Sequence, residues 1–107
     1  MTGWKQAYHL SYRTPLLVEL DIPDDAWLRH IKRYGLTEDI WVCQRATVVS
    51  ITSLDGSRSF QKAASLKAYD FFYEVGKEVV ALKDESLGNR PGIYFFKTRE
   101  QAINYEY

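Results

Sequence analysis

Side chains able to carry acid–base or nucleophilic chemistry are few and scattered in this sequence. His9 and His30 lie too far apart to form a helical metal-binding pair, and neither stands beside another ligand residue. Cys43 is the only cysteine, so a Cys43–His9 dyad requires a tertiary contact. A lone cysteine in an apolar strand is more often a small buried hydrophobe. We therefore expect no catalytic residue, no bound metal and no cofactor.

The carboxylates also lack a catalytic pattern, because the acidic pairs are direct sequence neighbours. These pairs are Asp24 and Asp25, Glu38 and Asp39, and Asp84 and Glu85. Neighbouring side chains diverge in regular structure, so capping and solvation are the expected roles. The sequence contains no phosphate-binding loop, dinucleotide glycine pattern or nucleophile elbow. This argues against the common ATPase, dehydrogenase and hydrolase classes.

A block of cations and aromatic rings late in the chain is the strongest candidate for a binding site. The ten residues from Arg90 to Arg99 include both of these arginines, one lysine and three aromatic residues. Because side chains alternate along a strand, Tyr94 and Phe96 are predicted to share one face. Gly92 leaves room for a group close to the backbone. The two rings are therefore the predicted stacking surface for a base.

Cations and backbone N–H groups are predicted to complete this site. Thr98 and Gln101 match the capping box of a helix, whose first N–H groups attract anions. Arg45 lies in an apolar run, where a guanidinium needs a partner, and Trp41 is expected on its face of that run. The predicted ligand-binding residues are Arg45, Arg90, Tyr94, Phe96, Thr98, Arg99 and Trp41. The competing interpretation is that the rings are core and the arginines extend over it.

The elements that hold these residues are predicted to be short and mostly β. Strands are expected at residues 4–9, 16–22, 40–51, 71–75, 78–82 and 92–96. A turn is expected at residues 54–57, and Gly76 and Lys77 are expected to close a tight hairpin. Helices are expected at residues 26–34 and after Thr98, while residues 59–68 are ambiguous with some helical character. The predicted fold is α+β, a mostly antiparallel sheet with two short helices.

Composition and charge limit the size and the partners of the protein. Its 107 residues are 46% hydrophobic and 15% aromatic, which suits one small domain over residues 1–107. Fourteen basic residues balance fourteen acidic ones, which argues against bulk nucleic-acid binding. No apolar stretch reaches the length of a membrane span, and a single cysteine suits the cytoplasm. Three Trp and eight Tyr exceed what a small core buries, so we expect a homo-oligomer, most simply a symmetric dimer.

Four stretches of the sequence carry a resemblance to a known family. They are residues 17–26, 43–51, 69–79 and 91–105, the last containing Pro-Gly-Ile-Tyr-Phe-Phe-Lys-Thr-Arg-Glu-Gln-Ala. In this order they resemble an uncharacterised domain found beside pentapeptide repeats in large DNA viruses, phages and some bacteria. Asn89 and Tyr94 stand where that family often has a cysteine and a histidine, and residues 27–39 look like an insertion. The repeats are absent, so the resemblance implies a free-standing version with no inherited activity.

A weaker likeness concerns the same closing block. The Gly-Ile-Tyr-Phe at residues 92–95, followed by a helix, resembles the nicotinamide-side segment of ADP-ribosyltransferases, and His9 resembles their first-strand histidine. The only glutamate beyond the block is Glu106, and the chain is short for that class. The likeness implies an ADP-ribose-type ligand rather than transferase activity.

Three functions follow from these observations. The first is a non-catalytic binding protein of phage or viral type that sequesters a small anionic nucleotide-derived signal, such as a cyclic nucleotide or an ADP-ribose-like compound, to counter host immune signalling. The second is a protein-interaction module that binds and inhibits a host defence protein. The third is a small ADP-ribosyltransferase-like or hydrolytic enzyme that uses His9 or Glu100. The first two imply action in the host cytoplasm if the protein is virus-encoded.

Overall fold

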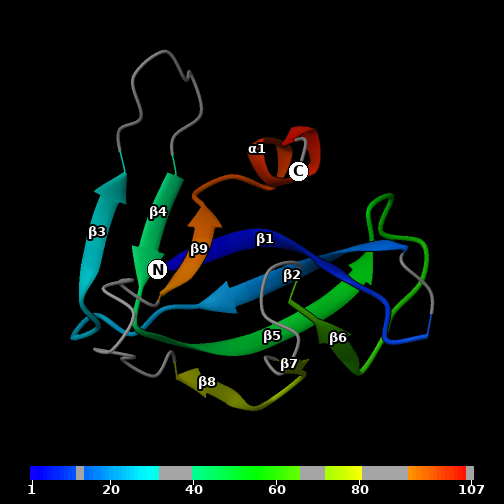
Figure 1. Cartoon of the computed structure of the whole chain (residues 1–107), viewed down its shortest axis with the longest axis horizontal. Coiled ribbons are helices and arrows are strands. Elements are labelled where there is room, and N and C mark those ends of the chain that lie inside the picture. The colour runs from blue at the N-terminus through cyan, green and yellow to red at the C-terminus, as the bar shows by residue number, and fades with distance from the viewer. Residues whose placement is uncertain (12–13, 32–39, 66–71, 81–91, 106–107) are drawn as a thin grey trace, which may run out of the picture.

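The structure, a computed structural model of the chain, describes residues 1–11, 14–31, 40–65, 72–80 and 92–105. In these residues one nine-stranded sheet is accompanied by a single short helix (Figure 1). The strands are β1 (Thr2–Tyr8), β2 (Pro15–Asp21), β3 (Leu28–Ile31), β4 (Ile40–Cys43), β5 (Arg45–Ser53), β6 (Lys62–Ala64), β7 (Phe72–Glu74), β8 (Glu78–Val80) and β9 (Ile93–Phe96), and the helix is α1 (Arg99–Asn104). The predicted small domain with a mostly antiparallel sheet is confirmed.

The sheet places the first strand in its middle. The main path runs β3-β4-β9-β1-β2-β5-β8, while β6 pairs with β1 and with β7. β1 and β2 form a long regular antiparallel pair, from Thr2 opposite Asp21 to Tyr8 opposite Pro15. The last strand, β9, lies on the other side of β1, with Phe96 opposite Trp4. The beginning and the end of the described chain therefore meet at β1.

Each face of the sheet carries a hydrophobic core. On the larger one, β2 contributes Leu16, Val18 and Leu20, which pack with Tyr73 and Phe95 among others. The smaller core lies under α1 and consists of Leu17, Ile40, Phe96 and Ala102. Because both faces of β2 are covered, its sequence is a nearly continuous apolar run rather than a clean alternation.

The predicted helix at residues 26–34 is wrong where the structure describes it. Residues 28–31 form β3, which pairs with β4 from Leu28 opposite Cys43 to Ile31 opposite Ile40. A helix of two or three turns is marginal in water without tertiary packing. Pairing with β4 supplies that packing, because His30 stacks on Trp41 with ring centroids 4.5 Å apart. The sheet thus includes the first part of the segment that looked like an insertion, and most of the remainder lies outside the described residues.

The predicted long strand at residues 40–51 is divided by a bend at Gln44. β4 pairs with β3 and β9, whereas β5 pairs with β2 and β8. Three strands lie between β4 and β5 in the sheet, although the two are consecutive in the chain. Because a single residue joins them, the sheet must curve so that β4 and β5 meet at Gln44, where the chain passes from one set of partner strands to the other.

The tight turn predicted at Gly76 and Lys77 is present, since the Lys77 amide donates to the Glu74 carbonyl at 3.0 Å, but the strands on its two sides do not pair with each other as a hairpin. β7 pairs with β6, and β8 pairs with β5. The turn itself is held by β5, because the Gly76 amide donates to the Val48 carbonyl at 2.8 Å and the Val48 amide donates to the Lys77 carbonyl at 3.0 Å. Residues 62–64, for which a helix was considered, are β6. The loop expected at residues 84–91 lies outside the described residues.

Two local predictions are confirmed. The turn at residues 54–57 contains Gly56 with φ of +78°, a left-handed conformation that suits glycine. Thr98 caps α1, since its Oγ1 accepts the Gln101 amide at 3.2 Å. Among the described residues, no helix combines the length and the apolar character that crossing a membrane requires.

Candidate functional site

The structure separates the two arginines that were predicted to share a pocket. Arg45 is the first residue of β5, while the Arg99 guanidinium donates from Nη2 to the carbonyl of Leu54, just beyond the other end of β5, at 3.2 Å. The nine residues of β5 extend roughly 25–30 Å along the strand. One small ligand therefore does not contact both guanidinium groups. Arg90, the third predicted arginine, lies outside the described residues.

Arg45 already has acidic partners. Its guanidinium forms an ion pair with Asp25 in the turn before β3, and Nη1 lies 3.9 Å from Oε2 of Glu78 on β8. Asp25 and Glu78 are therefore the partners that Arg45 was predicted to need. Both carboxylates are largely exposed, so the pairs are expected to contribute modestly to the free energy of unfolding.

Phe96 and Thr98 serve the fold rather than an open site. Phe96 is buried in the smaller core, and its ring centroid lies 5.1 Å from that of Tyr105. The Thr98 hydroxyl is engaged in the helix cap. The space beside Gly92 is filled as well, because a Cβ atom there would lie 2.1 Å from Cγ1 of Val42. The glycine thus permits close packing of β4, not the approach of a ligand.

Trp41 lies on the opposite face of the sheet from Tyr94. Trp41 is opposite Phe95 and Val42 is opposite Tyr94, so the two side chains point to different sides. The Trp41 ring stacks on His30 and lies 4.0 Å from Nζ of Lys97. Its Nε1 is buried without a hydrogen-bond partner in the described part of the chain. The side chains of His30 and Lys97 therefore already contact the Trp41 ring.

Tyr94 belongs to an exposed surface that the sequence did not predict. Register places Arg29, Val42 and Tyr94 in one row across β3, β4 and β9, and side chains in such a row share a face. The Trp27 ring lies 5.6 Å from Cζ of Arg29. Trp27 is 45% exposed and Tyr94 is 39% exposed. We call Trp27, Arg29 and Tyr94 the aromatic–arginine surface.

Arg29 is the unusual member of this surface. Its Nε is buried and lacks a hydrogen-bond partner among the described residues. A buried donor without an acceptor carries a desolvation cost, so such atoms are rare in folded proteins. Because the sequence predicted a helix at residues 26–34, Trp27 and Arg29 were not expected on one surface. The available signal was the spacing of Trp27 and Arg29, two residues apart, which places both on one face of a strand.

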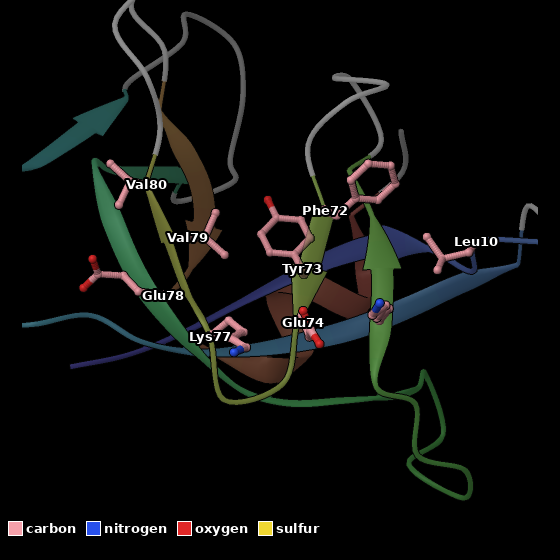
Figure 2. A pocket seen from close by; sticks show the side chains of 9 residues that line it. Leu10, Phe72, Tyr73, Glu74, Lys77, Glu78, Val79 and Val80 are labelled. Atoms are coloured by element: carbon pink, nitrogen blue, oxygen red, sulfur yellow. The ribbon is translucent and has the colours of Figure 1, made fainter.

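A second feature is an open hollow between β7 and β8, with a volume of about 630 Å³. Figure 2 shows the side chains of Tyr73 and Val79 in the gap between the two strands. Exposed Phe72 and Val80 add apolar area. Lys62, Glu74, Lys77 and Glu78 supply two positive and two negative charges around the hollow. The hollow is therefore apolar in its lining and balanced in charge.

The larger core contains a lysine. Lys5 is 8% exposed, and its Nζ lies 5.0 Å from the centroid of the Tyr73 ring. Burial disfavours the ammonium form and lowers the pKa of Lys5 to about 8. Burial also raises the pKa of the Cys43 thiol to about 11, so this cysteine is neutral at physiological pH. The neutral, fully buried thiol fits the predicted structural role rather than a nucleophilic one.

The remaining candidates for chemistry are held by local contacts. The His9 ring packs edge-on against Phe60 with centroids 5.4 Å apart, and its Nδ1 accepts the Ser11 amide at 3.1 Å. Within the described residues, no three His, Cys, Asp or Glu side chains are grouped so as to hold a metal ion.

Comparison with known proteins gives one relationship. No curated protein and no solved structure matches the chain. Residues 1–102 match the family DUF5758, which is described as a family of unknown function. This match includes every described strand and most of α1. The chain therefore belongs to the DUF5758 family of unknown function.

Proposed function

We propose that the protein is a non-catalytic interaction module that binds another protein through the aromatic–arginine surface. The observation that carries this proposal is the exposure of Trp27 and Tyr94 around Arg29, whose Nε has no acceptor in the described residues. Trp, Tyr and Arg dominate the binding energy of protein interfaces because they offer large, rigid contact area and directed donors. An exposed cluster of these three types is a typical binding surface.

The extent of the surface across neighbouring strands supports a macromolecular partner. The row from Arg29 to Tyr94 lies across three neighbouring strands near the end of the sheet (Figure 1). Small ligands usually bind in concave sites that bury most of their area, whereas protein partners bind flatter surfaces. The resemblance of residues 91–105 to the domain of viral and phage proteins supplies the proposed setting, in which the partner is a host defence protein that is inhibited in the cytoplasm.

Selection from a displayed library of random peptides tests this function without knowledge of the host. Peptides selected on the wild-type protein are measured by calorimetry against Trp27→Ala and Tyr94→Ala. We expect at least tenfold weaker binding to each variant, with an unchanged melting temperature. Val49→Ala is the matched control, because Val49 on β5 is 48% exposed but lies outside the surface. Peptides that bind all three variants equally, or a library that gives no binder, would contradict the proposal.

The hollow between β7 and β8 favours a second candidate function, sequestration of a nucleotide-derived signal. Its volume of about 630 Å³ accommodates a nucleotide, Phe72 is an aromatic residue that is 54% exposed, and Lys62 and Lys77 are cations beside it. Calorimetry with cyclic dinucleotides, cyclic ADP-ribose isomers and NAD tests this candidate. A ligand present at a hundred times its dissociation constant should raise the free energy of unfolding by about 2.7 kcal/mol. Lys62→Ala and Lys77→Ala should weaken binding, whereas Lys97→Ala should not. A flat titration with all of these compounds would exclude it.

A further inference from the structure

The aromatic–arginine surface lies beside an edge of the sheet that is open among the described residues. β3 is the terminal strand of the main path, and among the described residues it pairs only with β4. Every second residue of a terminal strand directs its N–H and C=O groups outward, where they can pair with another extended chain. Recognition modules use such edges to add a strand from a partner, with backbone hydrogen bonds for affinity and alternate side chains for specificity.

The strands beside the aromatic–arginine surface carry no acidic side chain of their own. β3, β4 and β9 contain Arg29 but no aspartate or glutamate, and Lys97 directly follows β9, whereas Asp39 directly precedes β4 in the sequence. Arg45 is neutralised by Asp25 and Glu78, whereas the buried Nε of Arg29 has no acceptor in the described part of the chain. A segment that covers Arg29 without supplying an anion would leave a buried cation unpaired, which is costly.

A second copy of the chain is a poor occupant for this edge. Directly opposite residues share a face of the sheet, so in a two-fold antiparallel pair of β3 strands a register centred on Arg29 places the two Arg29 side chains opposite each other. Basic side chains directly opposite each other destabilise a strand pair. The occupant that the edge favours therefore carries carboxylates.

On the basis of the function proposed above, we propose that the partner contributes an acidic extended segment that adds to the edge of β3 opposite β4, with a carboxylate on Arg29 and an apolar side chain on Trp27. Trp27 and Arg29 are two residues apart, which matches the two-residue period of a strand. The segment thus has an acidic and an apolar residue in alternate positions. A carboxylate can accept two hydrogen bonds from one guanidinium, which adds orientation to the charge pairing.

Three synthetic peptides test the charge part of this proposal. They share the sequence Thr-Val-Thr-X-Thr-Val-Thr, where X is Glu, Gln or Lys, and their binding is measured by fluorescence anisotropy at low salt. The wild-type protein should bind the Glu peptide at least tenfold more tightly than the Gln peptide. Arg29→Gln should abolish this difference, and Arg29→Glu should reverse the preference toward Lys. Arg29→Lys should retain part of the preference, which keeps the test informative if another variant fails to fold.

A matched arginine controls for a general loss of positive charge. Arg58 lies 5.5 Å from the ring of Phe60, much as Arg29 lies beside Trp27, but it is remote in the sequence from β3, β4 and β9. Arg58→Gln should therefore leave the affinity for the Glu peptide within twofold of the wild-type value. An equal loss with Arg58→Gln and Arg29→Gln would show nonspecific attraction and overturn the proposal.

Backbone methylation tests strand addition separately. N-methyl groups on alternate residues of the Glu peptide block either the N–H groups that face β3 or those that face away. One methylated series should lose at least tenfold in affinity, and the other should bind like the parent peptide. If both series bind equally, strand addition is wrong.

The peptides selected on the wild-type protein distinguish this proposal from the proposed function. Selected peptides whose binding depends on Trp27 and Tyr94, but not on their own acidic side chains or backbone N–H groups, would support the interaction module and refute the addition of an acidic strand. If no binder depends on Trp27 and Tyr94, both proposals fail.

Discussion

At the scale of single residues, Lys5 is a buried lysine whose pKa lies well below its ordinary value. Its ammonium group sits in the larger core against the Tyr73 ring, which provides cation–π attraction but little replacement for hydration. The lowered pKa measures the remaining cost of keeping the charge in this place. The folded protein therefore releases the Lys5 proton at a lower pH than the unfolded chain does.

We predict that the free energy of unfolding rises between pH 8 and pH 9. The pKa of Lys5 is about 8 in the folded protein and 10.5 ordinarily, so in this window the unfolded chain binds more protons and a higher pH favours the folded state. The rise should be about 1 kcal/mol, since one proton changes stability by at most about 1.4 kcal/mol per pH unit. Urea unfolding at pH 7, 8 and 9 measures it.

Two other buried groups limit this rise and provide its control. The pKa of Cys43 is raised from 9.0 to about 11, and burial also raises the pKa of Tyr73. From about pH 9 the unfolded thiol loses a proton that the folded one keeps, and this contribution opposes that of Lys5. Stability should therefore stop rising near pH 9. In Lys5→Met the rise between pH 8 and pH 9 should vanish, and an unchanged rise would refute its assignment to Lys5.

For some of the candidate residues, the residue type and its sequence neighbours were enough to predict the structural role. The need of Arg45 for a partner follows from its place in an apolar run, and Asp25 meets it. The single cysteine was expected in the core, and it is fully buried. Arg29 was missed because its role depends on which element holds it, and on a helix Trp27 and Arg29 would diverge. Residues 28–31 form a strand because they pair with β4, and no local sequence pattern indicates that pairing.

At the scale of elements, the packing of β9 against β4 depends on Gly92. A Cβ atom at residue 92 would overlap Val42, whose side chain is fully buried and cannot move away easily. Gly92→Ala should therefore lower the free energy of unfolding by about 1–3 kcal/mol, the usual range for overpacking. Chemical denaturation measures this loss.

A double-mutant cycle identifies the cause of that loss. Val42→Ala creates room beside residue 92, so combining it with Gly92→Ala should destabilise the fold less than the sum of the two single changes. The coupling should be at least about 0.5 kcal/mol, the lower end for residues in contact. Strictly additive effects would mean that Gly92 matters for its backbone freedom and not for its contact with Val42.

Hydrogen bonds from the side chain of Gln6 on β1 hold the helix α1 against the sheet. Nε2 of Gln6 donates to the carbonyls of Ala102 at 2.8 Å and of Ile103 and Tyr105 at 3.1 Å each. These carbonyls belong to the end of the helix, where no intrahelical donor reaches them. A six-residue helix is too short to be stable alone, so this contact and the smaller core hold it in place.

We predict that Gln6→Leu detaches α1 before the sheet unfolds. The change leaves buried carbonyls without a donor, which should lower stability by about 2 kcal/mol. Trypsin cleavage after Arg99 should accelerate under native conditions, because local unfolding exposes that bond. Gln61→Leu is the matched control, since Gln61 is exposed. Equal cleavage rates in the two variants would contradict this role of Gln6.

Sequence patterns identified the elements whose signals are local. The apolar run of β2 and the Thr98 cap of α1 indicate their elements without help from the rest of the chain. The pattern failed at residues 28–31 and 62–64, where short segments suit both helix and strand and the neighbouring strand decides. It also failed at Gln44 and in the strand pairing around Gly76, because these depend on contacts with strands remote in the sequence.

At the scale of the whole molecule, the expected homo-oligomer stays a prediction. The exposed apolar residues Leu10, Phe72 and Val80 gather around the hollow, which is a region where a second copy can bind. We expect light scattering at increasing concentration to reach twice the chain mass of 12.5 kDa. Phe72→Ser should shift the protein toward the monomer, whereas Arg29→Gln should not. A constant mass of 12.5 kDa over a wide concentration range would contradict the prediction.

The central place of β1 has a consequence for how the chain is made. β1 emerges from the ribosome early, but its neighbour β9 follows roughly 85 residues later. At about 5–20 residues per second, this delay lasts about 4–17 seconds. During that time the edge of β1 that later meets β9 lacks its native partner, and nascent strands with such edges are prone to aggregate. Slow translation of the region between β5 and β9 should therefore lower the yield of folded protein, even though the finished molecule is unchanged.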